Sequence, residues 1–331
     1  MVVLLILIII IAIIFDFTNG ANDSANAIAT IVSTKVLSPM QAVIMASVLN
    51  MAGAFIGTHV ATTIGKGIVN ADIIAGCQTI ILAALMGAIL WNLITRYFGL
   101  PSSSSHALIG GLIGAAVAYK GFNSLQYSSI IDIVILPLFL SPLAGFIGGY
   151  LLMLALAWIT CKLNPRKMNK LFKRLQVVAA AFMALTHGSN DGQKTMGIIT
   201  LALFLFHQIP AIEVPFWVKL ICATAIAIGT ATGGWKIIKT MGKKIFKMEP
   251  VHGFAAETSS ALVIMTASLI GAPISTTHVF SSSILGVGSS KRFSAVRWGV
   301  AGQMVTAWVL TLPASAIVGM ICFYIINLFL G

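Results

Sequence analysis

Long apolar runs dominate this chain from one end to the other. Runs of about 15 to 30 residues recur, and the first fills almost all of positions 1–15. A helix needs about 20 apolar residues to cross the hydrocarbon core of a membrane. Only 8% of the 331 residues are charged and 58% are hydrophobic, whereas soluble domains are about 25% charged. The chain is therefore predicted to be an all-α polytopic membrane protein embedded in a lipid bilayer.

Several other classes are disfavoured by the same pattern. A transmembrane β-barrel would alternate apolar and polar residues in segments of about ten. The first run lacks the basic start and small-residue cleavage site of a signal peptide, so we expect it to be the first span. The four cysteines are far apart and form no CxxC pair, which predicts neither a disulfide framework nor a metal site. We find no nucleophile–base pairing and no nucleotide-binding loop, so an enzyme is not expected.

The net charge of +12 is concentrated in three short stretches. Fourteen of the twenty Lys and Arg residues lie in 162–174, 236–247 and 291–297. Positive residues gather in the cytoplasmic loops of membrane proteins. These stretches are therefore predicted to be cytoplasmic loops, and the charge is not read as a nucleic-acid-binding surface.

Two motifs occur twice in the chain. TNGANDS (18–24) matches THGSNDG (186–192) at an offset of 168, and GLPSSSSH (99–106) matches GAPISTTH (271–278) at an offset of 172. A shorter match pairs 64–68 with 241–245. Matches in the same order at nearly the same offset indicate a duplication. The predicted organisation is a first repeat at 1–160, a basic connector at 161–175 and a second repeat at 176–331.

Charge also indicates that the two repeats face opposite ways. Lys291, Arg292 and Arg297 follow the second hydroxyl-rich motif, but Lys120 alone follows the first. Equivalent loops would then lie on opposite sides of the membrane, as in the inverted repeats of secondary transporters. We predict about twelve helical segments, broken helices at the Asn-rich motifs, re-entrant hairpins with tips at 99–106 and 271–278, and both termini outside.

The Asn- and Asp-containing motifs predict a cation site. Gly tolerates unusual backbone angles and Asn competes for backbone hydrogen bonds, so a helix break is expected there. Carboxylate, amide and freed carbonyl oxygens suit a small hard cation such as Na+. An unpaired buried aspartate costs at least ~2.5–3.5 kcal/mol on insertion scales. Alternatively, the aspartates cap helices or pair with a lysine such as Lys194. The candidate cation ligands are Asn19, Asn22, Asp23, Asn190, Asp191 and Glu257.

The hydroxyl-rich motifs predict an anion site. Pro and Ser/Thr favour the first turn and the N-cap of a helix, so half-helices are expected over 103–119 and 275–288. Helix N-termini bind oxyanions through free N–H groups. The alternative is that these hydroxyls only cap helices and mediate packing. The candidate anion ligands are Ser103, Ser104, Ser105, Ser275, Thr276 and Thr277.

Four further polar residues have less defined roles. Glu257 has no acidic counterpart in the first half, and it is expected either to bind a proton or cation or to pair with a hydroxyl. Asp16 aligns with Ala184, so its role is expected to be specific to the first half. His106 and His278 follow the hydroxyl runs and are expected to pack or cap there rather than to contact the ligand.

NGANDSANA with THGSNDGQKTMGII, and GLPSSSSHALIGG with GAPISTTH, resemble the PiT family of inorganic phosphate transporters over essentially the whole chain. The resemblance implies cation-coupled symport of inorganic phosphate, a plasma-membrane homodimer and no cofactor. It implies that Asn22, Asp23, Asn190 and Asp191 serve the coupling ions and phosphate, and that the Ser/Thr tips bind phosphate. Glu257 matches a family glutamate, whose first-half partner in some members falls at Asn50 here.

The expected function is therefore Na+-coupled phosphate import by alternating access. The alternatives are a proton-coupled transporter of phosphate or metal–phosphate, a transporter of another oxyanion such as sulfate, and an anion channel.

Overall fold

The computed structural model describes residues 2–66, 71–162 and 164–330, and every regular element in these ranges is helical. The helices of the first half are α1 (Val2–Ser33), α2 (Pro39–Ala54), α3 (His59–Lys66), α4 (Ala71–Gly76), α5 (Thr79–Phe98), α6 (Ser104–Lys120), α7 (Tyr127–Ile130) and α8 (Leu136–Thr160). Those of the second half are α9 (Pro165–Leu205), α10 (Phe216–Thr232), α11 (Trp235–Lys239), α12 (Pro250–Leu269), α13 (Thr276–Lys291) and α14 (Trp298–Leu330). The prediction of an all-helical fold is confirmed.

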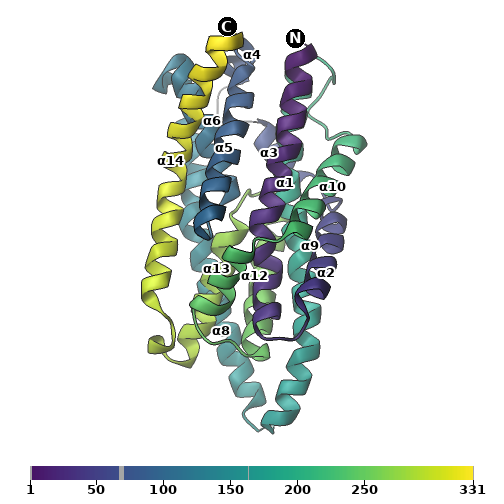
Figure 1. Ribbon diagram of the computed structural model, residues 1–331, viewed down its shortest axis with the longest axis vertical. Helices are drawn as coiled ribbons and strands as arrows, with labels where there is room; N and C mark the ends of the chain where they lie inside the picture. Colours follow the sequence, from purple (N-terminus) through teal and green to yellow (C-terminus); the bar gives the residue numbers. More distant parts are fainter. Residues whose placement is uncertain (1, 67–70, 163, 331) are drawn as a thin grey trace.

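Four of the described helices are long and apolar enough to cross a membrane: α1, α5, the stretch Tyr127–Thr160 and α14. A fifth candidate is the pair Phe216–Thr232 and Trp235–Lys244, which is bent by 60°. Both chain termini lie at one end of the molecule, and the turn between α8 and α9, with its basic residues, lies at the other (Figure 1). The start of α1 and the end of α14 are thus far from the basic start of α9.

Two helix–turn–helix hairpins lie where the re-entrant hairpins are predicted. Helix α5 ends at Gly99, which has a left-handed φ of 68°, and α6 starts after the N-cap Ser103. Helix α12 ends near Gly271, with a φ of 75°, and α13 starts after the N-cap Ser275. The α5–α6 hairpin occupies the end that holds the termini, and α12–α13 occupies the opposite end (Figure 1). The tips of both hairpins are buried, so each chain reversal occurs inside the molecule.

The predicted helix breaks at the Asn-rich motifs are wrong. Helix α1 runs unbroken through 18–24, and α9 runs unbroken through 186–192. The motif glycines allow close packing instead of a break. A Cβ on Gly20 would lie 2.3 Å from the carbonyl oxygen of Ile226 in α10, and one on Gly188 would lie 2.1 Å from that of Asn50 in α2. Each motif helix thus touches the backbone of a helix from the other half.

The breaks occur in the helices that follow. The turn between α2 and α3 contains Gly57 with a φ of 77°, and α10 ends at Gly233 with a φ of 66°. Each break lies against the motif helix of the other half. The Ile56 carbonyl accepts hydrogen bonds from Ser189 and Gln193 of α9, and the Gly234 amide donates to Ser24 of α1. Non-helical backbone inside a membrane protein needs such partners.

The apolar core consists of two clusters with a polar layer between them. On α1, Leu5 to Phe15 belong to one cluster and Ala25 to Ile31 to the other. On α9, Met196 to Leu205 join the first cluster, and Ala180 to Ala184 join the second. The motif residues lie between these segments on both helices. The fold therefore holds a polar layer near mid-height, where α1, α9 and the two hairpin tips meet.

Candidate functional site

The paired aspartates of the two motifs lie close together. Ligand atoms of Asp23 on α1 and of Asp191 and His187 on α9 all lie within 4.8 Å of one another. All three side chains are buried. Two carboxylates at such a distance repel one another unless positive charge lies between or beside them. The structure thus brings residues of both motifs together.

The two hairpin tips also meet in this layer. The Oγ atoms of Ser103 and Ser275 accept hydrogen bonds from the amides of His106 and His278, each at 3.2 Å, which is N-capping geometry. The rings of His106 and His278 lie 4.9 Å apart. The His278 ring also stacks on Trp308 at 4.5 Å. The histidines thus pack the tips together, as expected from the sequence.

Hydroxyl groups of the second tip contact both aspartates. Thr277 donates to Asp23 at 2.9 Å, and Thr276 donates to Asp191 at 3.0 Å. Asn26 of α1 donates to the same two hydroxyls, at 3.3 Å to Thr276 and 3.0 Å to Thr277. The candidate anion ligands and the candidate cation ligands therefore form one hydrogen-bonded group.

Lys194, which belongs to the second half, lies at the centre of this group. Its ammonium donates to the Asp191 carboxylate, to the Ser105 hydroxyl at 2.5 Å and to the Ile274 carbonyl at 2.8 Å. Its side chain is only 2% exposed. The lysine thus contacts one motif and both hairpin tips. For Asp191, the alternative of pairing with a lysine is correct.

Several buried oxygens in the layer have no hydrogen-bond donor within the described part of the chain. The side-chain amide nitrogens of two motif asparagines form hydrogen bonds. Asn22 donates to the Asn92 carbonyl of α5, and Asn190 donates to the Ser268 hydroxyl of α12, both at 3.0 Å. These bonds fix the amide orientation. The oxygens that remain are Oδ1 of Asn19, Asn22, Asn26 and Asn190, and Oγ of Ser104.

Glu257 lies apart from the paired aspartates. Its carboxylate accepts hydrogen bonds from Thr30 of α1 and, at 3.4 Å, from Gln176 of α9. Thr30 is seven residues beyond Asp23, which is roughly 10 Å along a helix. Asp16 lies on the other side, where its carboxylate accepts a hydrogen bond from Thr195 at 2.9 Å. Both acids are fully buried, and each has one carboxylate oxygen without a hydrogen bond from the described residues.

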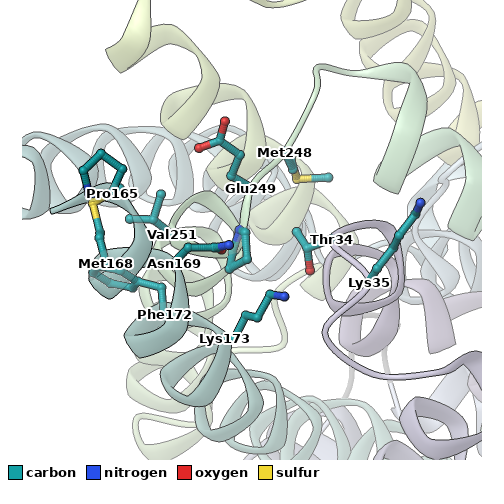
Figure 2. Close-up of a pocket in the computed structure, with 11 residues that line it drawn as sticks. Thr34, Lys35, Pro165, Met168, Asn169, Phe172, Lys173, Met248, Glu249 and Val251 are labelled. Carbon is teal, nitrogen blue, oxygen red and sulfur yellow. The ribbon is translucent and has the colours of Figure 1, made fainter.

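A pocket of about 520 Å³ with mixed polar and apolar lining opens near the basic connector. Figure 2 shows its lining side chains coming from the end of α1, the start of α9 and the segment around Glu249 that begins α12. Thr34 in this lining donates to Gln176 at 2.9 Å, and Gln176 contacts Glu257. Hydrogen bonds thus lead from the pocket towards the polar layer.

The polar layer itself is closed. The candidate ligands are at most 7% exposed. Beside Ser105 and Lys194 lies a cavity of about 10 Å³, which is close to the smallest volume that holds one water. Admission of any larger solute needs the tips or the motif helices to move.

Sequence reasoning gave too little weight to Lys194, His187 and Asn26. The signal was in the internal repeat, because the 168-residue offset aligns Lys194 with Asn26 and His187 with Asn19. His187 is held by the side chain of Asn50 at 3.1 Å. Asn50 lies on α2 and also donates to Thr230 at 2.8 Å. Asn50, which the family resemblance marks as the first-half position of an acidic residue in some members, therefore contacts the His187 side of the site.

Comparisons with known proteins agree with this architecture. A model of the phosphate transporter family matches residues 19–168 and 160–319. A Bacillus subtilis protein named "Probable low-affinity inorganic phosphate transporter" is 51% identical over 329 residues, covering 99% of this chain and 98% of its own. A Rhizobium meliloti protein of the same name is 47% identical over 327 residues, covering 98% and 97%. A solved structure titled "The sodium-dependent phosphate transporter" superimposes with a TM-score of 0.89 at 25% identity, covering 99% of this chain and all of that one.

Proposed function

Because this chain belongs to the phosphate transporter family, we propose that it imports inorganic phosphate together with Na+ by alternating access. One observation supports the coupling of phosphate transport to Na+ transport. Thr276 and Thr277 sit at a hairpin tip suited to an anion, and their hydroxyls contact the two carboxylates that suit a cation. A transporter of this kind carries its substrate without chemical change, so it is not an enzyme and needs no cofactor.

Phosphate is proposed to bind between the two hairpin tips. The tips present the N-termini of α6 and α13, whose free N–H groups and partial positive charge favour an oxyanion. Lys194 adds a full positive charge next to Ser105. The proposed ligands are the hydroxyls of Ser103, Ser104, Ser105, Ser275, Thr276 and Thr277.

Na+ is proposed to bind next to the phosphate, between the two motifs. Asp23 and Asp191 supply carboxylates, and amide oxygens without a hydrogen-bond donor in the described chain lie on Asn19, Asn22 and Asn190. Oxygen ligands of this kind suit hard cations. A cation beside the phosphate lowers the cost of taking either ion out of water, because each offsets the charge of the other. This mutual stabilisation is the physical basis of symport.

Glu257 is proposed to act on the cytoplasmic side of the site. It lies between the polar layer and the pocket at the basic end, linked by Thr30 on one side and Gln176 on the other. If the basic end is cytoplasmic, ions released from the motifs pass Glu257 on their way to this pocket. The lysines Lys35 and Lys173 in the pocket lining then favour a leaving anion.

We further propose that the chain consists of two inverted repeats and forms a homodimer in the plasma membrane. The order of long helix, broken helix, hairpin and closing helix occurs twice, from α1 to α8 and from α9 to α14. This supports repeats at 1–160 and 176–331 joined by 161–175. In secondary transporters of this kind, one group of helices moves against the other around the site. Cross-linking in membranes followed by mass analysis tests the dimer.

Uptake of labelled phosphate into proteoliposomes tests the function. We expect saturable accumulation that requires an inward Na+ gradient and that excess sulfate does not inhibit. Uptake that follows a pH gradient and ignores Na+ would favour a proton-coupled transporter of phosphate or metal–phosphate. Equal uptake of sulfate would contradict phosphate selectivity, and flux without accumulation would indicate a channel.

A further inference from the structure

The two motifs carry the same carboxylate but different charges around it. The first half offers Asn19, Asn22, Asp23 and Asn26, and the second offers His187, Asn190, Asp191 and Lys194 at the aligned positions. Two asparagines of the first half, each with an amide oxygen, are thus replaced by His187 and Lys194, which have no side-chain oxygen. A hard cation prefers oxygen ligands, so the two halves are not equivalent cation sites.

Lys194 and Asn26 make equivalent contacts in the structure. Asn26 donates to Thr277 at 3.0 Å, and Lys194 donates to Ser105 at 2.5 Å. Thr277 and Ser105 are themselves aligned by the 172-residue offset of the hairpin motifs. Sequence alignment and side-chain contacts therefore identify the same pair. Where the first half has a neutral amide, the second half has an ammonium group.

The surroundings of the Lys194 ammonium resemble those of a bound cation. Its three acceptors are a carboxylate oxygen of Asp191, the hydroxyl of Ser105 and the backbone carbonyl of Ile274. These are the kinds of oxygen that bind hard cations. The side chain is buried, and its three hydrogens match three acceptors.

We propose that the ammonium of Lys194 takes the place of one coupling cation at Asp191, so that the transporter carries one Na+ fewer per phosphate than two equivalent motifs would bind. This inference rests on the proposed function. Asp23, Asp191 and Lys194 together carry a formal charge of minus one, which a single free cation neutralises. That cation binds between the two carboxylates, towards Asp23, where the amide oxygens of Asn19, Asn22 and Asn26 have no donor among the described residues.

The test replaces Lys194 by the residue that the first half has in its place. Lys194→Asn frees Asp191 to bind a second Na+. We expect the ratio of ²²Na+ to ³²P-phosphate entering proteoliposomes to rise by one ion per phosphate. The matched control is Lys236→Asn, since Lys236 also donates to a backbone carbonyl, that of Tyr97, but is exposed and outside the site. The control is expected to keep the wild-type ratio.

If the variant folds but does not transport, a binding measurement tests the proposal instead. Equilibrium binding of ²²Na+ to purified Lys194→Asn is expected to show one ion more than the wild type, and Na+ is expected to raise its unfolding temperature more. If Lys194→Asn does not fold, Lys194→Met, which is similar in length and uncharged, takes its place. An unchanged number of bound and transported Na+ ions would overturn the proposal.

The outcome separates this inference from the proposed Na+ coupling. If wild-type uptake ignores Na+ but the Lys194 variant acquires Na+ dependence, Na+ coupling of the wild type fails and the role of Lys194 stands. If wild-type uptake requires Na+ and the variant binds no more of it, the role of Lys194 fails and Na+ coupling stands.

Discussion

At the scale of single residues, the two motif aspartates are similar in sequence but differ in their partners. Asp23 accepts a hydrogen bond from Thr277, whereas Asp191 also forms an ion pair with Lys194. Removal of one partner from a buried ion pair leaves the other charge uncompensated and costs about 3–5 kcal/mol. Equal substitutions at the two positions are therefore expected to have different effects.

We predict that Asp23→Asn abolishes Na+-dependent phosphate uptake while the protein stays folded. Asp191→Asn is expected to abolish uptake and also to lower the unfolding temperature, because Lys194 loses its carboxylate. Thermal unfolding in detergent, with uptake in proteoliposomes, measures both effects. The double variant Asp191→Asn/Lys194→Met is the control and is expected to recover stability but not transport. Near-normal uptake by Asp23→Asn would contradict the cation site.

A second prediction at this scale concerns Ser104. Its buried hydroxyl has no hydrogen-bond partner among the described residues, so its loss is expected to affect the ligand rather than the fold. A hydrogen bond to a charged group contributes about 1.5–3 kcal/mol. We therefore expect Ser104→Ala to raise the half-saturating phosphate concentration about tenfold or more, with a smaller change for Na+.

Uptake kinetics at varied phosphate and varied Na+ give the half-saturating concentration of each ion separately for Ser104→Ala. Ser128→Ala, which removes an exposed hydroxyl on α7, is expected to leave both unchanged. A larger effect on Na+ than on phosphate would argue against an anion site at the first tip.

At the scale of helices, the polar motifs are carried by continuous helices that pack closely on their neighbours. Gly20 and Gly188 allow α1 to touch α10 and α9 to touch α2. The sequence predicted hairpins, half-helices and N-caps, because proline and hydroxyl residues act locally. It misplaced the helix breaks, because whether a glycine bends a helix or admits a neighbour depends on what packs against it.

We predict that Gly20→Ala and Gly188→Ala each lower the unfolding temperature and the rate of uptake. The new Cβ would lie 2.3 Å or 2.1 Å from a backbone carbonyl oxygen, and overpacking of this kind costs typically about 1–3 kcal/mol. Gly302→Ala is the matched control, because a Cβ there meets no atom within 4 Å and alanine favours the helix α14. Full stability of Gly20→Ala would show that α1 and α10 separate freely.

At the scale of the whole molecule, the ends of the chain and its basic loops lie at opposite ends (Figure 1). The sequence predicted both termini on the side opposite the basic loops, because the distribution of Lys and Arg sets orientation and the number of crossings between those loops places the ends of the chain. It could not show how Lys194 is used. That depends on Ser105 and Ile274, which lie 89 and 80 positions away along the chain.

The orientation gives a prediction that uses a native residue. Cys161 directly follows α8 and is the exposed first residue of the basic connector, whereas Cys222 and Cys322 are buried. If the basic end is cytoplasmic, a membrane-impermeant maleimide is expected to label Cys161 in inside-out vesicles but not in intact cells. Cys161→Ser is the control and accounts for any labelling of Cys77. Labelling of Cys161 in intact cells would reverse the topology.

The meeting of the two hairpin tips has a consequence for the response to voltage. Each hairpin occupies one half of the molecule, so the closed polar layer lies where the two tips meet. Where water reaches the tips from one side, most of the membrane potential falls across this layer. A charge crossing the whole potential changes in free energy by about 2.3 kcal/mol per 100 mV. A small shift of the tips past the two aspartates would then move ions through nearly the full voltage, and any net charge carried per phosphate would make uptake electrogenic.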